Sequence, residues 1–244
     1  MRLSPHVAIL ELPLQLAGRN EIIYPVAVLE DGSITLIDTG LPGQVALIRK
    51  ALEELGGSLE QVRRIILTHQ DIDHIGSLPE LVRLTGAEVW AHAAEVPVIE
   101  GRRLPVKMSP ERLKAMPEET RQQMERFLGS LGSLQVSRSL SDGEVLPLAG
   151  GTVVIFTPGH TPGHLSFFLS GPKLLVSGDE LRVVEDQLVG PAPQATPDMP
   201  LALESMQKLV GLDIERVLCY HGGLFSDHPK ERIAELASQI EQSS

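Results

Sequence analysis

Short apolar runs of strand length alternate with amphipathic segments of helix length along most of this 244-residue chain. In the first part, near-continuous apolar positions predict strands over Val7–Leu16, Ile22–Leu29 and Ile34–Asp38. Asp31-Gly32 separates the last two runs and is a strong hairpin signal. Residues Pro42–Leu55 predict an amphipathic helix, because apolar side chains recur at helical spacing and two glycines follow. Strands that alternate with helices in this way indicate a layered α/β arrangement.

The second part of the chain repeats this alternation. Its predicted elements are a hairpin over Gly143–Phe156, strands over Leu165–Leu169 and Lys173–Val176, a helix over Leu201–Val210, a strand over Ile214–Tyr220 and a closing helix over Pro229–Glu241. Residues 181–200 are rich in proline and predict mostly loop. No repeat, linker or low-complexity tract divides the sequence. We therefore expect a single domain over residues 1–244, compatible with two sheets that face each other.

Residues 92–135 differ from the rest because four prolines divide them into short pieces. Ser109-Pro110 is typical of a helix cap followed by proline at the first helical position. Three of the six methionines, Met108, Met116 and Met124, lie here. Methionine commonly fills gaps in a core, but it also suits an adaptable apolar binding surface. Two interpretations stay open: ordinary core packing, or a helical cap inserted over a functional cleft.

The bulk composition limits the classes of partner. Hydrophobic residues make up 42% of the chain, which is typical of a globular protein. The formal net charge of −11 disfavours nucleic acid and anionic membranes as partners. The N-terminus is not a signal peptide, and no stretch reaches the length of a membrane span, so we expect a cytoplasmic location. The one cysteine, Cys219, has apolar neighbours and is interpreted as a buried, unreactive thiol.

A dense polar cluster follows the apolar run that ends at Leu67. His69, Asp71, Asp73 and His74 lie within six consecutive residues, and all four side chain types bind metals. The cluster occupies the loop after a predicted strand, where α/β proteins usually place their chemistry. Such closely spaced groups destabilise one another unless a cation lies among them. The sequence therefore predicts a metal site here.

Three further strands end on a histidine or an aspartate: the candidates are His160, Asp179 and His221. A lone histidine at a strand end is more often structural than a ligand, but the repetition at several strand ends is hard to explain in that way. Seven candidate ligands exceed what one tetrahedral zinc needs. The count therefore favours a site for two metal ions.

These motifs resemble those of the metallo-β-lactamase superfamily, from Asp38-Thr39-Gly40 to His221. The family signature H-x-H-x-D-H corresponds to His69–His74, with His160, Asp179 and His221 downstream. The resemblance implies an α+β fold, an αββα sandwich of two mixed sheets flanked by helices. It also implies that His69, Asp71 and His160 hold one metal, that Asp73, His74 and His221 hold the other, and that Asp179 bridges them.

The sequence departs from the signature at Asp71, where most members of the family have histidine. Flavodiiron proteins have a carboxylate, glutamate, at this position, which motivates a redox alternative. The flavodoxin-like domain of those proteins has no counterpart in this sequence. We expect two divalent metal ions, with zinc first and iron or manganese as alternatives.

The interpretation from sequence is a metal-dependent hydrolase acting on an ester, thioester, lactone or related acyl bond of a small molecule. Two cations would bridge a water and lower its pKa toward ~7, and the resulting hydroxide would attack the carbonyl carbon. Asp73 is the catalytic candidate, as a ligand that orients the hydroxide or accepts the proton. His164 is expected to hydrogen-bond a ligand and Asp38 to anchor the loops beneath the site. The alternatives are a diiron oxidoreductase and an inactive metal-binding regulatory protein; the oligomeric state stays open.

Overall fold

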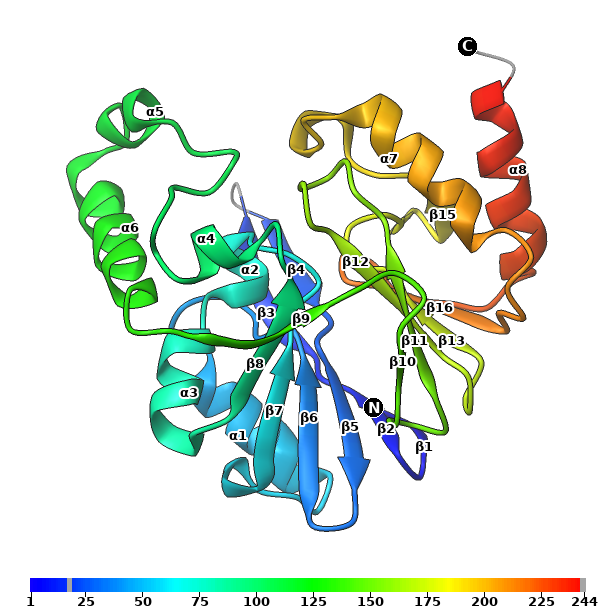
Figure 1. The fold of residues 1–244 in the computed structure, drawn as a ribbon, viewed down its shortest axis with the longest axis horizontal. Helices are drawn as coiled ribbons and strands as arrows, with labels where there is room; N and C mark the ends of the chain where they lie inside the picture. Colours follow the sequence, from blue (N-terminus) through cyan, green and yellow to red (C-terminus); the bar gives the residue numbers. More distant parts are fainter. Residues whose placement is uncertain (17–18, 242–244) are drawn as a thin grey trace.

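The computed structural model describes residues 1–16 and 19–241. Within them, two large β-sheets face each other and helices cover the outer faces, as Figure 1 shows. The first half of the chain supplies a seven-stranded sheet of order β1-β2-β5-β6-β7-β8-β9, and the second half supplies a six-stranded sheet of order β10-β11-β12-β13-β16-β17, counted over the described residues. Both sheets mix parallel and antiparallel pairs. The predicted αββα sandwich is confirmed.

The elements of the first half follow the predicted alternation. Its sheet contains β1 (Arg2–Ser4), β2 (Val7–Ile9), β5 (Val26–Glu30), β6 (Ser33–Ile37), β7 (Val62–Ile66), β8 (Glu88–His92) and β9 (Val136–Leu140). A separate hairpin is formed by β3 (Leu12–Leu16) and β4 (Arg19–Ile23). The helices are α1 (Val45–Glu54), α2 (Ile72–Ile75) and α3 (Leu78–Thr85).

The second half has the same design. Its sheet contains β10 (Val145–Leu146), β11 (Thr152–Phe156), β12 (Leu165–Leu169), β13 (Leu174–Val176), β16 (Arg216–Cys219) and β17 (Gly223–Phe225). A small hairpin is formed by β14 (Arg182–Val184) and β15 (Gln187–Val189), and the helices are α7 (Met199–Met206) and α8 (Pro229–Glu241).

Three apolar layers hold the sandwich together, and the alternation of side chains along each strand assigns residues to them. In β7, Ile65 packs outward against α1 and α3, whereas Ile66 packs between the sheets. In β16, Leu218 faces the layer between the sheets, whereas Val217 and Cys219 face α8 and its neighbours. Strands buried on both faces are therefore apolar throughout, which is why they appear in the sequence as continuous runs.

Three predicted segments differ from the structure. The run Val7–Leu16 is not one strand, because β2 ends at Ile9 and β3 begins at Leu12 in the separate hairpin. The run Ile22–Leu29 is not one strand, because β4 ends at Ile23 and β5 begins at Val26, after Pro25. Residues 181–200 are not mostly loop, because β14 and β15 form a hairpin there. Its turn residues Glu185 and Asp186 have φ of 49° and 60°. Two successive positive φ values are the type I′ geometry that suits a two-residue hairpin, but glutamate at such a position gives no sequence signal.

Three helices lie between β8 and β9, in the segment for which a cap is one interpretation: α4 (Val96–Ile99), α5 (Pro110–Lys114) and α6 (Glu118–Leu131). The predicted cap at Ser109 is present, since its side chain accepts a hydrogen bond from Arg112 N. In Figure 1 α5 and α6 stand to one side of the sandwich, above the first sheet. We call residues 92–135 the insertion.

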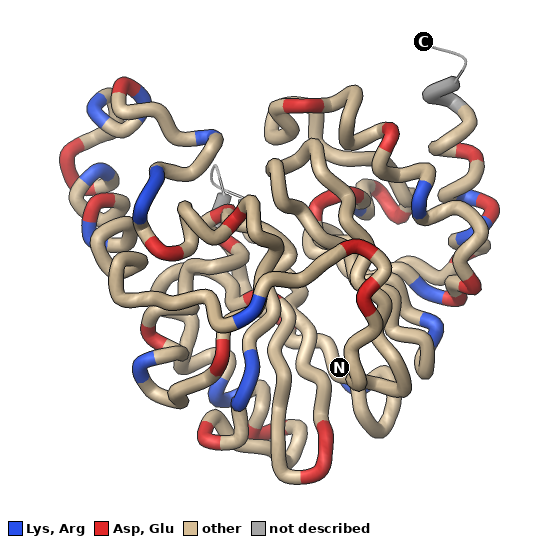
Figure 2. Tube along the Cα trace, viewed as in Figure 1, with Lys and Arg blue, Asp and Glu red and all other residues tan. Residues whose placement is uncertain are grey.

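Figure 2 shows basic positions interspersed with acidic ones over the visible trace, without a continuous basic stretch. No helix in the described part of the chain is long and apolar enough to cross a membrane.

The sheet topology brings the ends of several strands to one edge. β6, β7 and β8 are parallel neighbours, as are β13 and β16 in the other sheet. Parallel neighbours end at the same edge, so the loops after them lie close together. Asp38, the His69–His74 segment, Asp179 and His221 all lie in these loops, and His160 lies in the loop between β11 and β12.

Candidate metal centre

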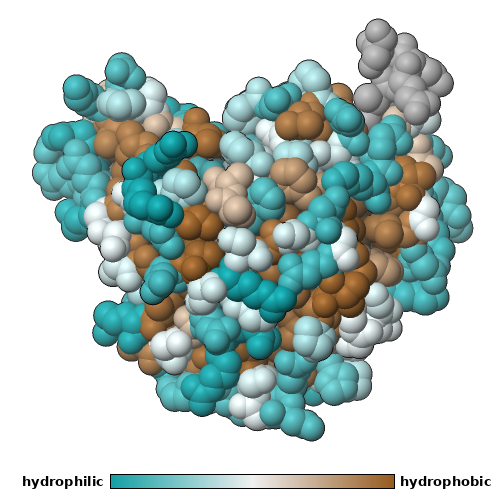
Figure 3. All heavy atoms as spheres, in the orientation of Figure 1, coloured by the Kyte–Doolittle hydropathy of each residue, from teal (hydrophilic) through white to brown (hydrophobic). Residues whose placement is uncertain are grey.

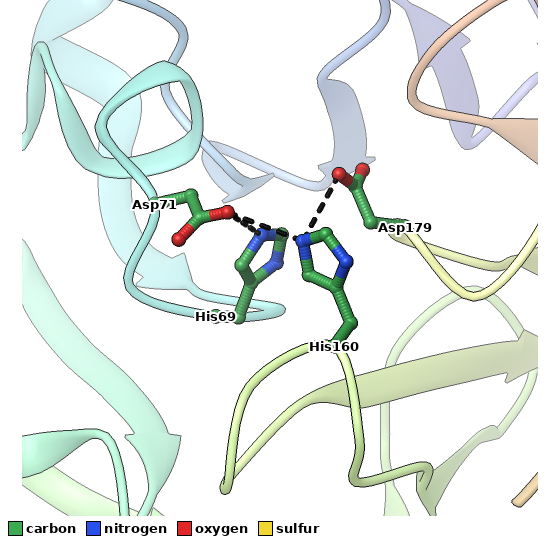
Figure 4. Close-up of side chains that lie close together, drawn as sticks. All are labelled: His69, Asp71, His160 and Asp179. Atoms are coloured by element: carbon green, nitrogen blue, oxygen red, sulfur yellow. Dashed lines mark hydrogen bonds and ion pairs between the residues drawn. The ribbon is translucent and has the colours of Figure 1, made fainter. Parts of the chain in front are cut away.

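The structure brings all seven predicted ligands together in two adjoining groups. The first group is His69, Asp71, His160 and Asp179, and Figure 4 shows their side chains pointing toward one another from three separate loops. The second group is Asp73, His74 and His221. Within each group one ligand atom of every residue lies within 4.8 Å of those of the others.

Short distances between the candidate ligand atoms mark the first group. His160 Nε2 lies 3.1 Å from Asp71 Oδ2 and 3.2 Å from Asp179 Oδ2. His69 Nε2 lies 3.4 Å from Asp71 Oδ2. Nitrogen and carboxylate oxygen atoms are held at such distances by a shared proton or by a positive charge among them.

Asp179 lies between the two groups. Its Oδ1 is 3.3 Å from His74 Nε2, and its Oδ2 is within 3.6 Å of His221 Nε2 while also contacting the first group. In the second group, Asp73 Oδ2 lies 3.2 Å from His221 Nε2 and 3.8 Å from His74 Nε2. The position of Asp179 is the one that a bridging carboxylate requires.

The donor atoms fit metal ions. His69 Nε2, His74 Nε2 and Asp179 Oδ1 are buried and have no hydrogen-bond partner among the described residues. Buried polar atoms are otherwise almost always paired. Imidazole nitrogen and carboxylate oxygen together are a donor set for zinc, iron or manganese. The residues present therefore fit the two metal ions that the resemblance implies.

The other ring nitrogens of three histidines each face an oxygen atom. His74 Nδ1 lies 2.9 Å from Asp38 Oδ2, His69 Nδ1 lies 3.0 Å from Thr68 Oγ1, and His160 Nδ1 lies 3.2 Å from Thr196 Oγ1. A proton on each Nδ1 can be donated to these oxygens, which leaves the Nε2 lone pair directed into the site. Metal-binding histidines are commonly oriented by such partners.

Asp38 anchors the segment that carries the first four ligands. Its carboxylate accepts hydrogen bonds from Thr68 N at 2.9 Å and Thr68 Oγ1 at 2.7 Å in addition to the contact with His74. Asp38 itself has a φ of 63°, a left-handed conformation that aspartate tolerates better than most residues. It therefore supports the loops beneath the site, as expected from the sequence.

Burial and neighbouring charges shift the pKa values of the site. Burial raises the pKa of a carboxyl, but His69, His160 and Lys107 outweigh this effect and hold the pKa of Asp71 well below its usual range. Burial also lowers the pKa of the His69 imidazole well below its usual value. At Asp71 and His69, an ionised carboxylate thus lies beside a neutral imidazole, the protonation states that metal binding needs. At His74, Asp38 and Asp179 outweigh burial and hold the pKa of the imidazole well above its usual value.

His164 lies behind the site and not in either group of ligands. Its Nε2 accepts a hydrogen bond from Asp179 N at 3.0 Å, and its Nδ1 lies 3.1 Å from Thr157 O. Burial lowers the pKa of His164 to about 3, so the ring is neutral. These contacts agree with the predicted role of orienting a ligand, here the backbone of Asp179.

A buried relay joins the insertion to both metal-ligand loops, and it was not predicted from the sequence. Val106 N donates to Gln70 Oε1 at 3.0 Å, and Gln70 Nε2 donates to Glu95 Oε2 at 2.8 Å. Glu95 Oε1 in turn accepts from Gly163 N at 2.5 Å, in the loop of His160. A Cβ at Gly163 would lie 2.6 Å from Glu95 Cγ, so the relay needs glycine there.

Lys107, also missed from the sequence, reaches into the first group. Its Nζ donates to Asp71 Oδ2 and lies 2.6 Å from His160 Nε2. Tyr220 was missed as well: its ring stacks on His74 with the centroids 3.7 Å apart, and its hydroxyl donates to Asp73 O. Long-range contacts of this kind leave no periodicity in the sequence.

Cys219 is buried, and burial raises its pKa to about 12, in agreement with an unreactive thiol.

Two mixed sheets between helices, with histidines and aspartates gathered at one edge, define an αββα sandwich that carries a candidate metal centre at that edge. A profile of the metallo-beta-lactamase superfamily matches residues 22–221. The probable metallo-hydrolase YflN of Bacillus subtilis is 31% identical over 223 residues, which cover 86% of this chain and 84% of that protein. The chain therefore belongs to the metallo-β-lactamase superfamily and stands among its metallo-hydrolases.

Two further comparisons agree with this assignment. The hydroxyacylglutathione hydrolase GloC of Haemophilus influenzae is 28% identical over 155 residues, which cover 62% of this chain and 63% of that protein. Among solved structures, the metallo-beta-lactamase family protein TTHA1429 of Thermus thermophilus matches with a TM-score of 0.76 and 26% identity, over 99% of this chain and 81% of the other.

Proposed function

We propose that this protein is a binuclear metal-dependent hydrolase that cleaves an ester, thioester, lactone or related acyl bond of a small molecule. The position of Asp179, with one oxygen toward each group of buried donor atoms, is the observation that carries this proposal. His69, Asp71 and His160 would hold one metal, and Asp73, His74 and His221 the other. The names of the relatives YflN and GloC support hydrolysis as the class of reaction.

The bound ions would supply Lewis-acid polarisation of the acyl carbonyl and a water acidic enough to attack it near neutral pH. The side chains of the protein orient the attacking water and the metal ligands. Asp73 is partly exposed at the mouth of the site, so its carboxylate can accept a proton from the attacking water or hold that water in place. Asp38 and His164 keep His74 and Asp179 in their required orientations.

The insertion covers the mouth of the site as a cap, which supports a substrate with an apolar acyl part. A cavity of about 190 Å³ is lined by Asp71 and Asp73 on one side and by Lys107, Met108, Met124 and Phe127 of the insertion on the other. A neighbouring cavity of about 1060 Å³ shares Ile72, Met124 and Phe127 with it. Figure 3 shows hydrophobic residues at the surface between the insertion and the body of the first half.

The proposal is tested by combining metal analysis with a substrate panel. Protein stripped of metal by chelation is reloaded with zinc, iron or manganese, and each form is assayed against esters, thioesters including hydroxyacyl thioesters, and lactones. We expect turnover that requires metal and that Asp179→Ala abolishes together with metal content. A protein that binds two metals but hydrolyses none of the panel would contradict the proposed reaction and favour a regulatory role.

One observation favours a second function, a diiron oxidoreductase. Because residue 71 is an aspartate, the first group contains two imidazoles and one carboxylate in addition to the shared Asp179. Two imidazoles and one carboxylate are the donor set typical of non-haem iron. Anaerobic loading with iron followed by measurement of oxygen uptake distinguishes this function from hydrolysis. Oxygen uptake coupled to an added reductant, with no acyl hydrolysis, would replace our first proposal with the second.

A further inference from the structure

Lys107 is a cation that belongs to the insertion but lies among the candidate ligands of the first metal. Its ammonium group contacts Asp71 Oδ2 and lies 2.6 Å from His160 Nε2, and only 19% of its side chain is exposed. An ammonium group has donors and no acceptor, so His160 Nε2 must present its lone pair to Lys107. The proton of His160 then lies on Nδ1, facing Thr196 Oγ1.

The backbone holds Lys107 in this place from both sides. On one side, Val106 N donates to Gln70, which the relay through Glu95 ties to the His160 loop. On the other side, Arg112 Nη1 donates to Lys107 O at 2.9 Å. An exposed lysine that happened to reach the site would not need these anchors. The anchoring residues therefore place the ammonium group as part of the site.

The ammonium group and a metal ion exclude each other at this position. A neutral imidazole has one acceptor nitrogen, so His160 Nε2 cannot accept from Lys107 and coordinate a metal at the same time. The like charges of the ammonium group and a divalent ion also repel each other strongly at such short distances. The short contacts of the second group run among Asp73, His74, His221 and Asp179, whereas Lys107 contacts Asp71 and His160, so the second group stands outside the competition.

The pairing also accounts for Asp71, the departure from the family signature. A carboxylate at this position forms an ion pair with an ammonium group, whereas the neutral histidine of most members would offer it no charge. Asp71 and Lys107 thus form a complementary pair drawn from two distant parts of the chain.

We propose that Lys107 is a tethered competitor of the first metal ion. The resting protein holds metal at Asp73, His74 and His221 with Asp179, and the first subsite fills only when the 105–108 segment carries Lys107 away. This inference rests on the proposed function only in that both need metal at these ligands. It makes the insertion a control element for metal occupancy of the site.

Metal binding itself provides the test. Metal-free wild type and Lys107→Met are titrated with zinc against a chromophoric chelator, and bound zinc is counted by mass spectrometry of the elements. We expect wild type to bind the first equivalent tightly and the second more weakly. If the competent conformer is populated at about 0.1–10%, Lys107→Met should tighten the second equivalent by about 10–1,000-fold and leave the first unchanged. Lys114→Met, an exposed lysine of α5, is the matched control and should bind as wild type does.

A second measurement uses the wild-type protein and does not depend on the folding of a variant. Acetylation of Lys107 by an amine-reactive reagent, followed by peptide mass spectrometry, should increase on addition of the second zinc equivalent and not of the first. Equal affinity for both equivalents in wild type and Lys107→Met, with constant acetylation, would overturn the inference while leaving a two-metal hydrolase intact. Stepwise binding without any acyl hydrolysis would instead contradict the proposed reaction alone.

Discussion

The two halves of the metal centre share Asp179 but are built in different ways. In the second group, His74 is fully buried, held by Asp38 and stacked on Tyr220, and Thr39 binds its backbone oxygen at 2.7 Å. In the first group, Asp71 forms an ion pair with Lys107 of the insertion, and His160 Nε2 lies 2.6 Å from the same ammonium group. The comparison suggests a fixed metal subsite beside an adjustable one that the insertion controls.

The same contrast appears in the way each half is connected to the core. Asp38 and Tyr220 lie at the ends of strands of the two facing sheets, so His74 of the second group is held from both sheets. Lys107 lies between the short helices α4 and α5, in a segment held mainly by a few hydrogen bonds. Segments with few buried contacts open at lower free energy than the core does. Adjustment is therefore expected at the first group.

Loss of the shared ligand should have the largest effect, because it removes the feature that the two groups have in common. Asp179→Ala takes a negative charge from both subsites, so we expect metal content and hydrolysis to be lost together. The measurement is bound metal per chain alongside turnover. His164→Ala is the matched comparison, since it removes no candidate ligand but only the contacts of His164 with Asp179 N and Thr157, and it should cost about 10–100-fold in metal affinity. Near-native metal content in Asp179→Ala would refute the two-metal assignment.

The site was more predictable from sequence than its surroundings. The four ligands from His69 to His74 lie within six consecutive residues and follow an apolar strand. Their proximity can therefore be predicted without knowledge of the tertiary structure. Each further ligand ends a strand as well, and parallel strands end at one edge. Lys107 follows no strand, Glu95 is a lone carboxylate after β8, and their contacts join positions 36 and 68 residues apart. Local pattern carries no information about contacts of that kind.

The fold was predictable to a similar degree, and for similar reasons. The closing helix α8 begins at Pro229 and ends at Glu241 as expected, because proline at the first turn and helical spacing of apolar residues act locally. β9, with three exposed residues among its five, was missed because its pairing with β8 and not its own pattern defines it. The same holds for the hairpin of β14 and β15, whose turn depends on positive φ at Glu185 and Asp186.

Weakening the fixed subsite alone should have the next largest effect. Asp38→Asn keeps a residue that tolerates a φ of 63°, but the amide binds the Nδ1 proton of His74 less strongly than the carboxylate does. We expect the tighter zinc equivalent to weaken by about 10–100-fold. Asp31→Asn, in an exposed hairpin turn, is the control. Unchanged affinity for the first equivalent would show that Asp38 serves the fold and not the second subsite.

Changing the adjustable subsite should alter which metal binds. Asp71→His replaces a hard, charged ligand by a neutral imidazole and removes the partner of Lys107. We expect the preference for zinc over manganese at the second equivalent to rise on the order of tenfold, or about 1.4 kcal/mol. Competitive loading with both metals measures the ratio. If wild type and variant load the same ratio, Asp71 is not a ligand and the first subsite is built from other residues.

The smallest effect is expected where the insertion contacts substrate and not metal. Met108 and Met124 line the cavity beside Asp71 and Asp73, whereas Met116 lines neither of the two cavities described around the insertion. Each side chain is only partly buried, so replacement by serine removes part of the ~1.5–3 kcal/mol that a fully buried methionine contributes. We expect Met108→Ser and Met124→Ser each to raise KM for an apolar acyl substrate by about threefold to tenfold with kcat and metal content unchanged, and Met116→Ser to change none of them. Because Met124 also packs against the outer core, thermal unfolding of each variant separates a weakened pocket from a weakened fold. A lower melting temperature in Met124→Ser with no selective change in KM, together with an unchanged Met108→Ser, would assign these methionines to packing and leave the insertion with a role at the metal alone.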